Sequence, residues 1–189
     1  MTRHVSRAAL ASTVLAWTAD TGRPLVVGNG FLSREVVAAG DGDHVVHLLA
    51  GMGLAPAVAA GMTLAGRPAA ALEGDGNHLM GLSGTATIGL AGIPLTHIVH
   101  WNGGWESTGG QRVVDPGRAH DVGATFGYAT TETVDDPAAL QEALTSAANT
   151  DGPTLIHVIG AMGDPPAPRS ALTMTDFTAR FRHWTNAPN

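Results

Sequence analysis

An α/β fold, with one parallel β-sheet and helices on both of its faces, is the fold class that this sequence predicts. Short apolar runs alternate along the chain with longer segments of helical character, which is the pattern of a parallel sheet. The runs are apolar at successive positions, as expected of strands buried on both faces. The 189 residues, 44% hydrophobic and 14% charged, fit one domain that spans residues 1–189 and has a sizeable core.

The first elements follow this alternation. Ser6–Ala19 has the apolar spacing of an amphipathic helix, and Pro24–Gly28 (PLVVG) is a short buried strand. The segment Ser33–Ala39 is expected to be a helix that Ser33 caps, with Glu35 in its first turn. In this interpretation the side chain of Glu35 forms an exposed ion pair, although Asn29 and the Ser-Arg-Glu run could equally contact a substrate or a partner.

The central elements are rich in small residues. Val45–Leu49 is predicted as the second strand, and the Ala-rich segment Leu54–Ala65 as a helix with a proline in its first turn, where proline is tolerated. Ala69–Glu73 is predicted as the third strand. A Gly-Asp-Gly-Asn turn then leads to an expected helix over His78–Leu90, and Leu95–His100 is the fourth strand.

The last elements repeat the pattern. Arg118–Phe126 is predicted to be helical, Ala129–Val134 has the composition of a strand, and Pro137–Ala148 is a helix capped by Asp136. The two remaining elements are a buried strand and a final helix, Thr154–Gly160 and Asp176–Trp184. Parallel sheets bind ligands at the carboxyl ends of their strands. The chemistry is therefore expected in the glycine-rich loops that follow four of these strands, at 28–30, 50–53, 74–77 and 102–111.

Composition excludes several classes of function. With 10 basic and 16 acidic side chains, the net charge is −6, which argues against a nucleic-acid or anionic-membrane partner. The absence of cysteine excludes disulfides and thiolate chemistry, and the absence of lysine excludes Schiff-base chemistry.

Two uncharged stretches, Val45–Gly66 and Leu79–Trp101, are long enough to span a bilayer. Both are rich in Gly and Ala and contain proline and histidine, so they are interpreted as buried elements of a soluble protein. Met1–Thr21 weakly imitates a signal peptide but lacks a clear cleavage site. The expected location is cytoplasmic.

The turn after the third strand is the strongest chemical signal. Its glycines allow a ligand to approach the backbone, and the following helix N-terminus suits a phosphate. Asp75 would repel that phosphate unless a cation such as Mg²⁺ lies between them. Asn102 ends the next strand along the chain and offers a second oxygen ligand if the two strands are neighbours. Taken alone, an Asp-Gly turn is equally often only a turn.

The chain resembles the cofactor-binding (PP-type) domain of thiamine diphosphate enzymes, and within them the beta subunit of sulfopyruvate decarboxylase and the matching part of phosphonopyruvate decarboxylase. The resemblance extends from about Leu25 to Phe181. It rests chiefly on two runs, GDGNHLM at 74–80 and WNGGWESTGGQ at 101–111, with further similarity at 29–35 and 50–55.

The resemblance implies roles for individual residues. The implied Mg²⁺ ligands are Asp75, Asn102 and the carbonyl of Gly104. Met52 would be an apolar wedge beneath the bent cofactor, a position that suits a flexible thioether side chain. The carbonyl of Ala50 would accept from the aminopyrimidine, and the implied cofactor-binding set is Ala50, Gly51, Met52, Gly74, Asp75, Gly76, Asn77, Asn102, Gly104 and Trp105.

The candidate catalytic residues are Met52 and Glu106. Glu106 is expected beside the substrate space, together with Trp101 and Trp105. The resemblance therefore implies the beta-type subunit of a 2-oxo acid decarboxylase that acts on 3-sulfopyruvate or 3-phosphonopyruvate.

These enzymes need a glutamate from a pyrimidine-binding domain of similar size. That domain does not fit into 189 residues together with this one, so the expected partner is a separate alpha subunit in a hetero-oligomer. Two other functions stay open: an acetolactate synthase-like carboligase subunit, and a nonenzymatic cofactor-binding module. The nine histidines also suggest a metal site, but His97 and His100 would point to opposite faces of a strand.

Overall fold

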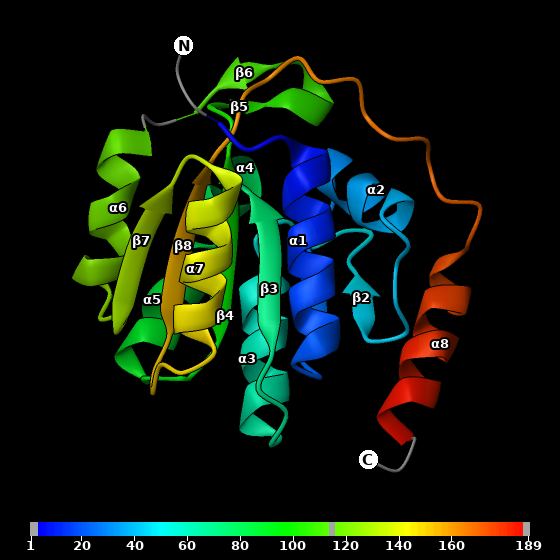
Figure 1. Cartoon of the computed structure of the whole chain (residues 1–189), viewed down its shortest axis with the longest axis horizontal. Coiled ribbons are helices and arrows are strands. Elements are labelled where there is room, and N and C mark those ends of the chain that lie inside the picture. The colour runs from blue at the N-terminus through cyan, green and yellow to red at the C-terminus, as the bar shows by residue number, and fades with distance from the viewer. Residues whose placement is uncertain (1–3, 114–115, 187–189) are drawn as a thin grey trace.

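The computed structural model describes residues 4–113 and 116–186. Six strands form one parallel sheet in the order β2-β1-β3-β4-β8-β7, which confirms the predicted fold class. The strands are β1 Leu25–Val27, β2 Val45–His47, β3 Ala70–Gly74, β4 Thr96–Trp101, β7 Thr130–Val134 and β8 Thr154–Ile159. A small antiparallel pair, β5 Gly104–Trp105 and β6 Gln111–Arg112, lies over the carboxyl edge of this sheet and encloses the 3₁₀ turn η1 Glu106–Thr108 (Figure 1).

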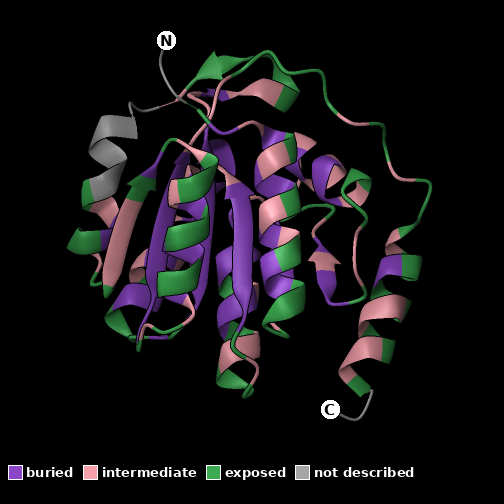
Figure 2. Cartoon of the chain, viewed as in Figure 1, coloured by how far each residue is buried: buried purple, intermediate pink, exposed green. Residues whose placement is uncertain are grey.

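Helices cover both faces of the sheet. The helices are α1 Arg7–Asp20, α2 Phe31–Ala38, α3 Ala55–Leu64, α4 Asp75–Met80, α5 Leu82–Leu90, α6 Pro116–Thr125, α7 Pro137–Ala147 and α8 Met174–Asn186. One hydrophobic cluster joins α1, α2 and α7 to the sheet, and a second joins α3 and α5 to the opposite face. The central strands are buried from both sides (Figure 2), which explains why they are apolar at successive positions.

The side chains of each strand alternate between the two clusters. Leu25 and Val27 belong to the first cluster, whereas Val26 belongs to the second. His97 and His100 likewise point to opposite faces of the sheet, as expected. Nδ1 of His97 lies 3.3 Å from the hydroxyl of Tyr128, a residue of the second cluster, whereas His100 lines the hollow described below.

Helix α8 packs against the outer edge of the sheet, beside β2 (Figure 1). The ring of Phe177 lies 4.6 Å from that of His47, and Arg180 pairs with Asp41 at 3.0 Å and Asp43 at 3.1 Å. The segment between β8 and α8 therefore crosses the carboxyl edge of the sheet before the chain turns down along β2 (Figure 1). No helix among the described residues has both the length and the hydropathy needed to cross a membrane.

The prediction of a single helix over His78–Leu90 is wrong. Helix α4 begins at Asp75, directly after β3, and a break at Gly81 separates it from α5. A Cβ atom on Gly81 would lie 2.2 Å from the carbonyl oxygen of Gly53, so the two backbones approach more closely than any side chain allows. The predicted loop at 74–77 is consequently the end of a strand followed by the first turn of a helix.

The interpretation of the second helix also needs correction. Helix α2 begins at Phe31, and Ser33 does not cap it but places its hydroxyl 2.9 Å from Nδ1 of His47. Glu35 is buried rather than part of an exposed ion pair. Its carboxylate accepts from the amide of Ala167 at 3.0 Å, so this residue ties α2 to the segment that precedes α8.

Candidate active site

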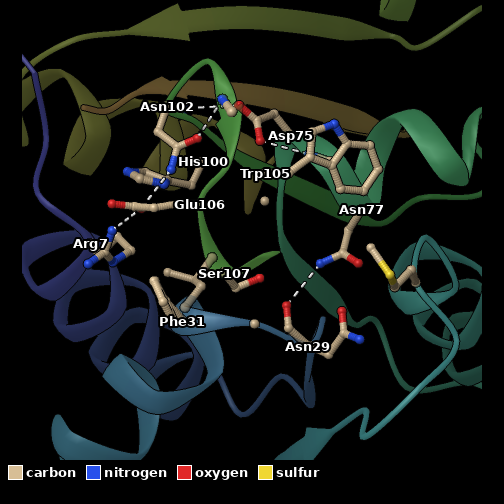
Figure 3. Close-up of a pocket in the computed structure, with 16 residues that line it drawn as sticks. Arg7, Asn29, Phe31, Asp75, Asn77, His100, Asn102, Trp105, Glu106 and Ser107 are labelled. Atoms are coloured by element: carbon tan, nitrogen blue, oxygen red, sulfur yellow. Dashed lines mark hydrogen bonds and ion pairs between the residues drawn. The ribbon is translucent and has the colours of Figure 1, made fainter. Parts of the chain in front are cut away.

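A hollow lies at the carboxyl ends of β1, β3 and β4, under the β5–β6 pair (Figure 3). Its lining residues are Arg7, Asn29, Gly30, Phe31, Leu32, Met52, Gly74, Asp75, Gly76, Asn77, His100, Asn102, Gly104, Trp105, Glu106 and Ser107. Strands β3 and β4 are direct neighbours, with Gly74 paired to His100, so the residues that follow them share this hollow. The expectation that Asp75 and Asn102 face the same crevice is confirmed.

Backbone amides hold the carboxylate of Asp75. One oxygen accepts from the amide of Gly76 at 2.7 Å, and the other accepts from the amides of Asn102 at 3.1 Å and Gly103 at 2.8 Å. Burial raises the pKa of Asp75, and these amides act in the opposite direction. The carboxylate is thus fixed in orientation at the edge of the hollow.

The side chain of Asn102 is oriented from both ends. Its Oδ1 accepts from the amide of Gly104 at 3.1 Å, and its Nδ2 donates to Glu106 at 3.0 Å (Figure 3). The carboxylate of Glu106 also accepts from the amide of Gly163 at 2.7 Å and pairs with the guanidinium of Arg7. Glu106 therefore positions Asn102 and is itself held by two distant segments of the chain.

Arg7 is the residue of this site that sequence reasoning missed. Its side chain is buried, with 2% of the residue exposed. Its guanidinium donates to Glu106 and to the carbonyl of Asp164, and it lies over the ring of Phe31. Ser6 caps α1, which makes Arg7 the first residue of that helix. An arginine at the start of an apolar helix was the available signal, but its two hydrogen-bond acceptors lie 99 and 157 residues away along the chain.

Gly76 and Asn77 form the floor of the hollow. A Cβ atom on Gly76 would lie 2.7 Å from the ring of Trp105, so only glycine fits at this position. Nδ2 of Asn77 donates to the carbonyl of Asn29 at 2.9 Å, while its buried Oδ1 has no hydrogen-bond partner among the described residues. An unsatisfied buried acceptor is expected where a ligand or its bound water supplies the missing donor.

Comparison with known proteins identifies the family. The model of the thiamine pyrophosphate enzyme C-terminal TPP binding domain matches residues 34–158, which include the β3–α4 turn and the Asn102 loop. The chain belongs to this family. Thiamine pyrophosphate is another name for thiamine diphosphate, so the resemblance read from the sequence is confirmed at the level of the family.

Relatives of this TPP-binding domain include two curated proteins. The chain is 35% identical over 170 residues to phosphonopyruvate decarboxylase of Streptomyces viridochromogenes, and 34% identical over 176 residues to phosphonopyruvate decarboxylase of Streptomyces hygroscopicus. Each match covers 87% of this chain but only 42% of the relative. The chain thus spans less than half the length of the curated relatives it matches.

Solved structures of the same fold are also found. 4-Hydroxybenzoylformate decarboxylase of Rhodococcus jostii RHA1 superposes with a TM-score of 0.71 at 20% identity, covering 87% of this chain and 34% of that one. Benzoylformate decarboxylase of Polynucleobacter necessarius gives a TM-score of 0.65 at 18% identity, covering 84% and 34%. At these identities, the two structures support the fold of the TPP-binding domain alone.

The predicted site residues of this TPP-binding domain separate into two groups. Nine of them line the hollow: Met52, Gly74, Asp75, Gly76, Asn77, Asn102, Gly104, Trp105 and Glu106. Ala50 and Gly51 are exposed and do not line it. Trp101, expected beside the substrate space, is instead buried in the second hydrophobic cluster, because it lies on the same side of β4 as Val99.

A polar cluster lies buried near this site. Glu73, His78 and His97 place one oxygen and two ring nitrogens within 4.8 Å of one another, and Nε2 of His97 lies 3.0 Å from Glu73. Burial alone would raise the pKa of Glu73, but the two imidazoles hold it below its ordinary value. The hydrogen bond between His97 and Glu73 joins β4 to β3 close to the turn that carries Asp75.

We expect the TPP-binding domain to lose stability as the pH falls from about 6.5 to about 4. Burial lowers the pKa of His100 to about 4, so the folded state resists a proton that the unfolded chain accepts. The full effect of this one residue is about 3 kcal/mol, present above pH 6.5 and lost progressively between about pH 6.5 and 4, where the unfolded chain binds the proton and the folded one does not. Burial lowers the pKa of His44 and His78 in the same direction.

Urea unfolding at several pH values measures this dependence. The variant H100Q, in which position 100 no longer titrates, is expected to have a flatter profile between pH 6.5 and 4, whereas H183Q, at an exposed position, keeps the original slope. A profile that H100Q leaves unchanged would contradict the assignment to His100.

Proposed function

We propose that this chain is the cofactor-binding part of a decarboxylase that uses thiamine diphosphate and Mg²⁺ to act on a 2-oxo acid of the 3-phosphonopyruvate or 3-sulfopyruvate class. The observation that carries the proposal is the shared hollow of Asp75 and Asn102, in a chain of the TPP-binding family. The curated relatives, which are phosphonopyruvate decarboxylases, support the substrate class.

The residues present fit the cofactor and its metal. Asp75 and Asn102 directly follow neighbouring strands and offer side-chain oxygens, and the carbonyl of Gly104 is the proposed third protein ligand. Oxygen ligands of this kind suit Mg²⁺, which commonly bridges carboxylates and phosphates. When bound, thiamine diphosphate supplies the carbon nucleophile that adds to the 2-oxo group and the electron sink that lets CO₂ leave.

The protein's own groups would bind the cofactor and orient the residues that hold its metal. Gly76 and Asn77 would hold the diphosphate at the start of α4, and the thioether of Met52 would support the cofactor from the edge of the hollow. Glu106 would keep the amide of Asn102 turned toward the metal, while Arg7 keeps Glu106 in place. In this assignment Glu106 is a positioning residue.

The proposed partner is a pyrimidine-binding domain that supplies the catalytic glutamate, carried by a separate alpha subunit. The curated relatives hold more than twice the matched length, which leaves room in them for such a domain. An affinity-tagged chain purified from its native cell is expected to recover a second chain in equal amount. Recovery of this chain alone would overturn the proposed subunit arrangement.

The recovered complex tests the reaction itself. Incubated with thiamine diphosphate, Mg²⁺ and 3-phosphonopyruvate or 3-sulfopyruvate, it is expected to release CO₂ and the corresponding aldehyde. Formation of an acyloin would instead identify a carboligase, and the absence of any turnover with either substrate would refute the proposed substrate class.

Removing the carboxylate charge of Glu106 is expected to weaken metal binding. In E106Q, Arg7 keeps only Glu35 as a charged partner and Asn102 loses a charged acceptor, so the Mg²⁺ concentration for half-maximal cofactor binding should rise about tenfold. Calorimetric titration of thiamine diphosphate at increasing Mg²⁺ measures this. The exposed E142Q is the matched control, and an unchanged Mg²⁺ dependence in E106Q would show that Glu106 does not orient Asn102.

A further inference from the structure

A second, wider groove adjoins the cofactor hollow. It is lined by Asn29, Gly30, Ser33, Arg34, Val37, His47, Leu48, Leu49, Ser107, Arg169, Ser170, Leu172, Thr173, Met174 and Phe177. Asn29, Gly30 and Ser107 line both spaces, so the two are continuous. Including its open mouth, the groove holds about 1230 Å³ of empty space, compared with about 480 Å³ for the cofactor hollow.

The walls of the groove come from α2, from the end of β2 and from the segment that leads into α8. Three contacts hold these walls together. The amide of Ala167 donates to Glu35 at 3.0 Å, the ring of Phe177 lies 4.6 Å from that of His47, and Arg180 pairs with Asp41 at 3.0 Å. The groove is therefore built by segments that are far apart in sequence but fixed to one another.

The charge of the groove is opposite to that of the chain. The net charge is −6, yet the lining contains two arginines and no aspartate or glutamate. Neither Arg34 nor Arg169 forms an ion pair with a carboxylate among the described residues, in contrast to Arg7 and Arg180. The guanidinium of Arg34 lies 5.0 Å from the centre of the Phe31 ring, which limits its position.

Carboxylates near these arginines in the sequence have other partners. Glu35 accepts from the amide of Ala167, Asp41 pairs with His47 and Arg180, and Asp176 accepts from the amide and hydroxyl of Thr173. Hydroxyl groups add neutral donors to the lining, at Ser107 and Ser170. Two free guanidinium groups with hydroxyls beside them are the groups that recognise a phosphonate, sulfonate or phosphate.

We propose that the groove binds a phosphonate-, sulfonate- or phosphate-type oxyanion through Arg34 and Arg169. The assigned source of this group is the anionic tail of the 2-oxo acid substrate, an assignment that rests on the proposed function. Continuity with the cofactor hollow supports it, because a substrate whose oxo group faces the cofactor can extend its tail past Ser107 into the groove. Arg7 cannot serve instead, since Glu106 already neutralises it.

Calorimetric titration with methylphosphonate tests the groove. The chain is first saturated with thiamine diphosphate and Mg²⁺, in a buffer without phosphate or sulfate, so that the diphosphate site is filled. The dissociation constant for methylphosphonate is expected to rise at least about tenfold in R34Q and in R169Q, because each loses a charge-assisted pair of hydrogen bonds. The matched control is R182Q, an exposed arginine of α8 outside the lining, which should bind as the unchanged chain does.

Two results would overturn the proposal: no methylphosphonate binding at about millimolar concentration, or binding that R34Q and R169Q leave unchanged. Thiamine diphosphate binding is measured in the same chains, so that a failure of the groove proposal can be distinguished from a failure of the proposed function. Loss of thiamine diphosphate binding in the unchanged chain would refute that function. Tighter binding of 3-phosphonopyruvate than of methylphosphonate identifies the substrate tail as the source, and equal binding identifies a free phosphate-type ion.

Discussion

Asp75→Ala is expected to lower the affinity for thiamine diphosphate in the presence of Mg²⁺ by about 100-fold or more, while the fold is kept. The substitution removes a proposed metal ligand and would leave the diphosphate charge without its bridging cation. Asp75 and Asn102 line the hollow, so water can take the place of the carboxylate there and accept from the amides of Asn102 and Gly103. Quenching of tryptophan fluorescence measures binding, because Trp105 lies against Gly76 on the floor of the same hollow.

The matched control for this variant is Asp151→Ala, which removes an exposed carboxylate elsewhere. It is expected to bind cofactor as the unchanged chain does, and circular dichroism of both variants checks the fold. If Asp75→Ala binds thiamine diphosphate with undiminished affinity and the same Mg²⁺ dependence, the metal-site assignment is wrong.

Met52→Ala is expected to lower the turnover number far more than the affinity for the cofactor. The proposed diphosphate and metal contacts lie at Asp75 and Asn77, so the affinity for the cofactor should change by no more than a few-fold. Without the thioether beneath it, the cofactor loses its fixed shape, and the turnover number of the complex with the partner should fall about 100-fold.

Met80→Ala provides the comparison, because Met80 is a methionine that is 58% exposed outside the hollow. It should leave both quantities unchanged. Equal losses of affinity and turnover in Met52→Ala would indicate that Met52 binds the cofactor rather than shaping it.

The strands of this fold could be predicted because a strand buried on both faces is apolar at successive positions, as in Leu25–Val27 and Thr154–Ile159. The break between α4 and α5 could not. It depends on the contact between Gly81 and Gly53, which are far apart in sequence, and an isolated glycine within an apolar helical pattern does not by itself indicate a break.

Asp75 and Asn102 could be placed together from the sequence, because residues that follow adjacent parallel strands meet at one edge of the sheet. Trp101 was placed wrongly, because alternation along β4 puts it on the side of His97 and Val99, in the buried cluster and not beside the substrate space. Arg7 could not be placed, since its partner Glu106 belongs to a loop 99 residues away and no periodic pattern links them.

The central claim is that this hollow binds thiamine diphosphate through a magnesium ion. Calorimetric titration of thiamine diphosphate into the purified chain, once with Mg²⁺ and once with a chelator, tests it most directly. The predicted result is one cofactor bound per chain with Mg²⁺ and no measurable binding with the chelator. Equal binding under both conditions, or none under either, would contradict the account.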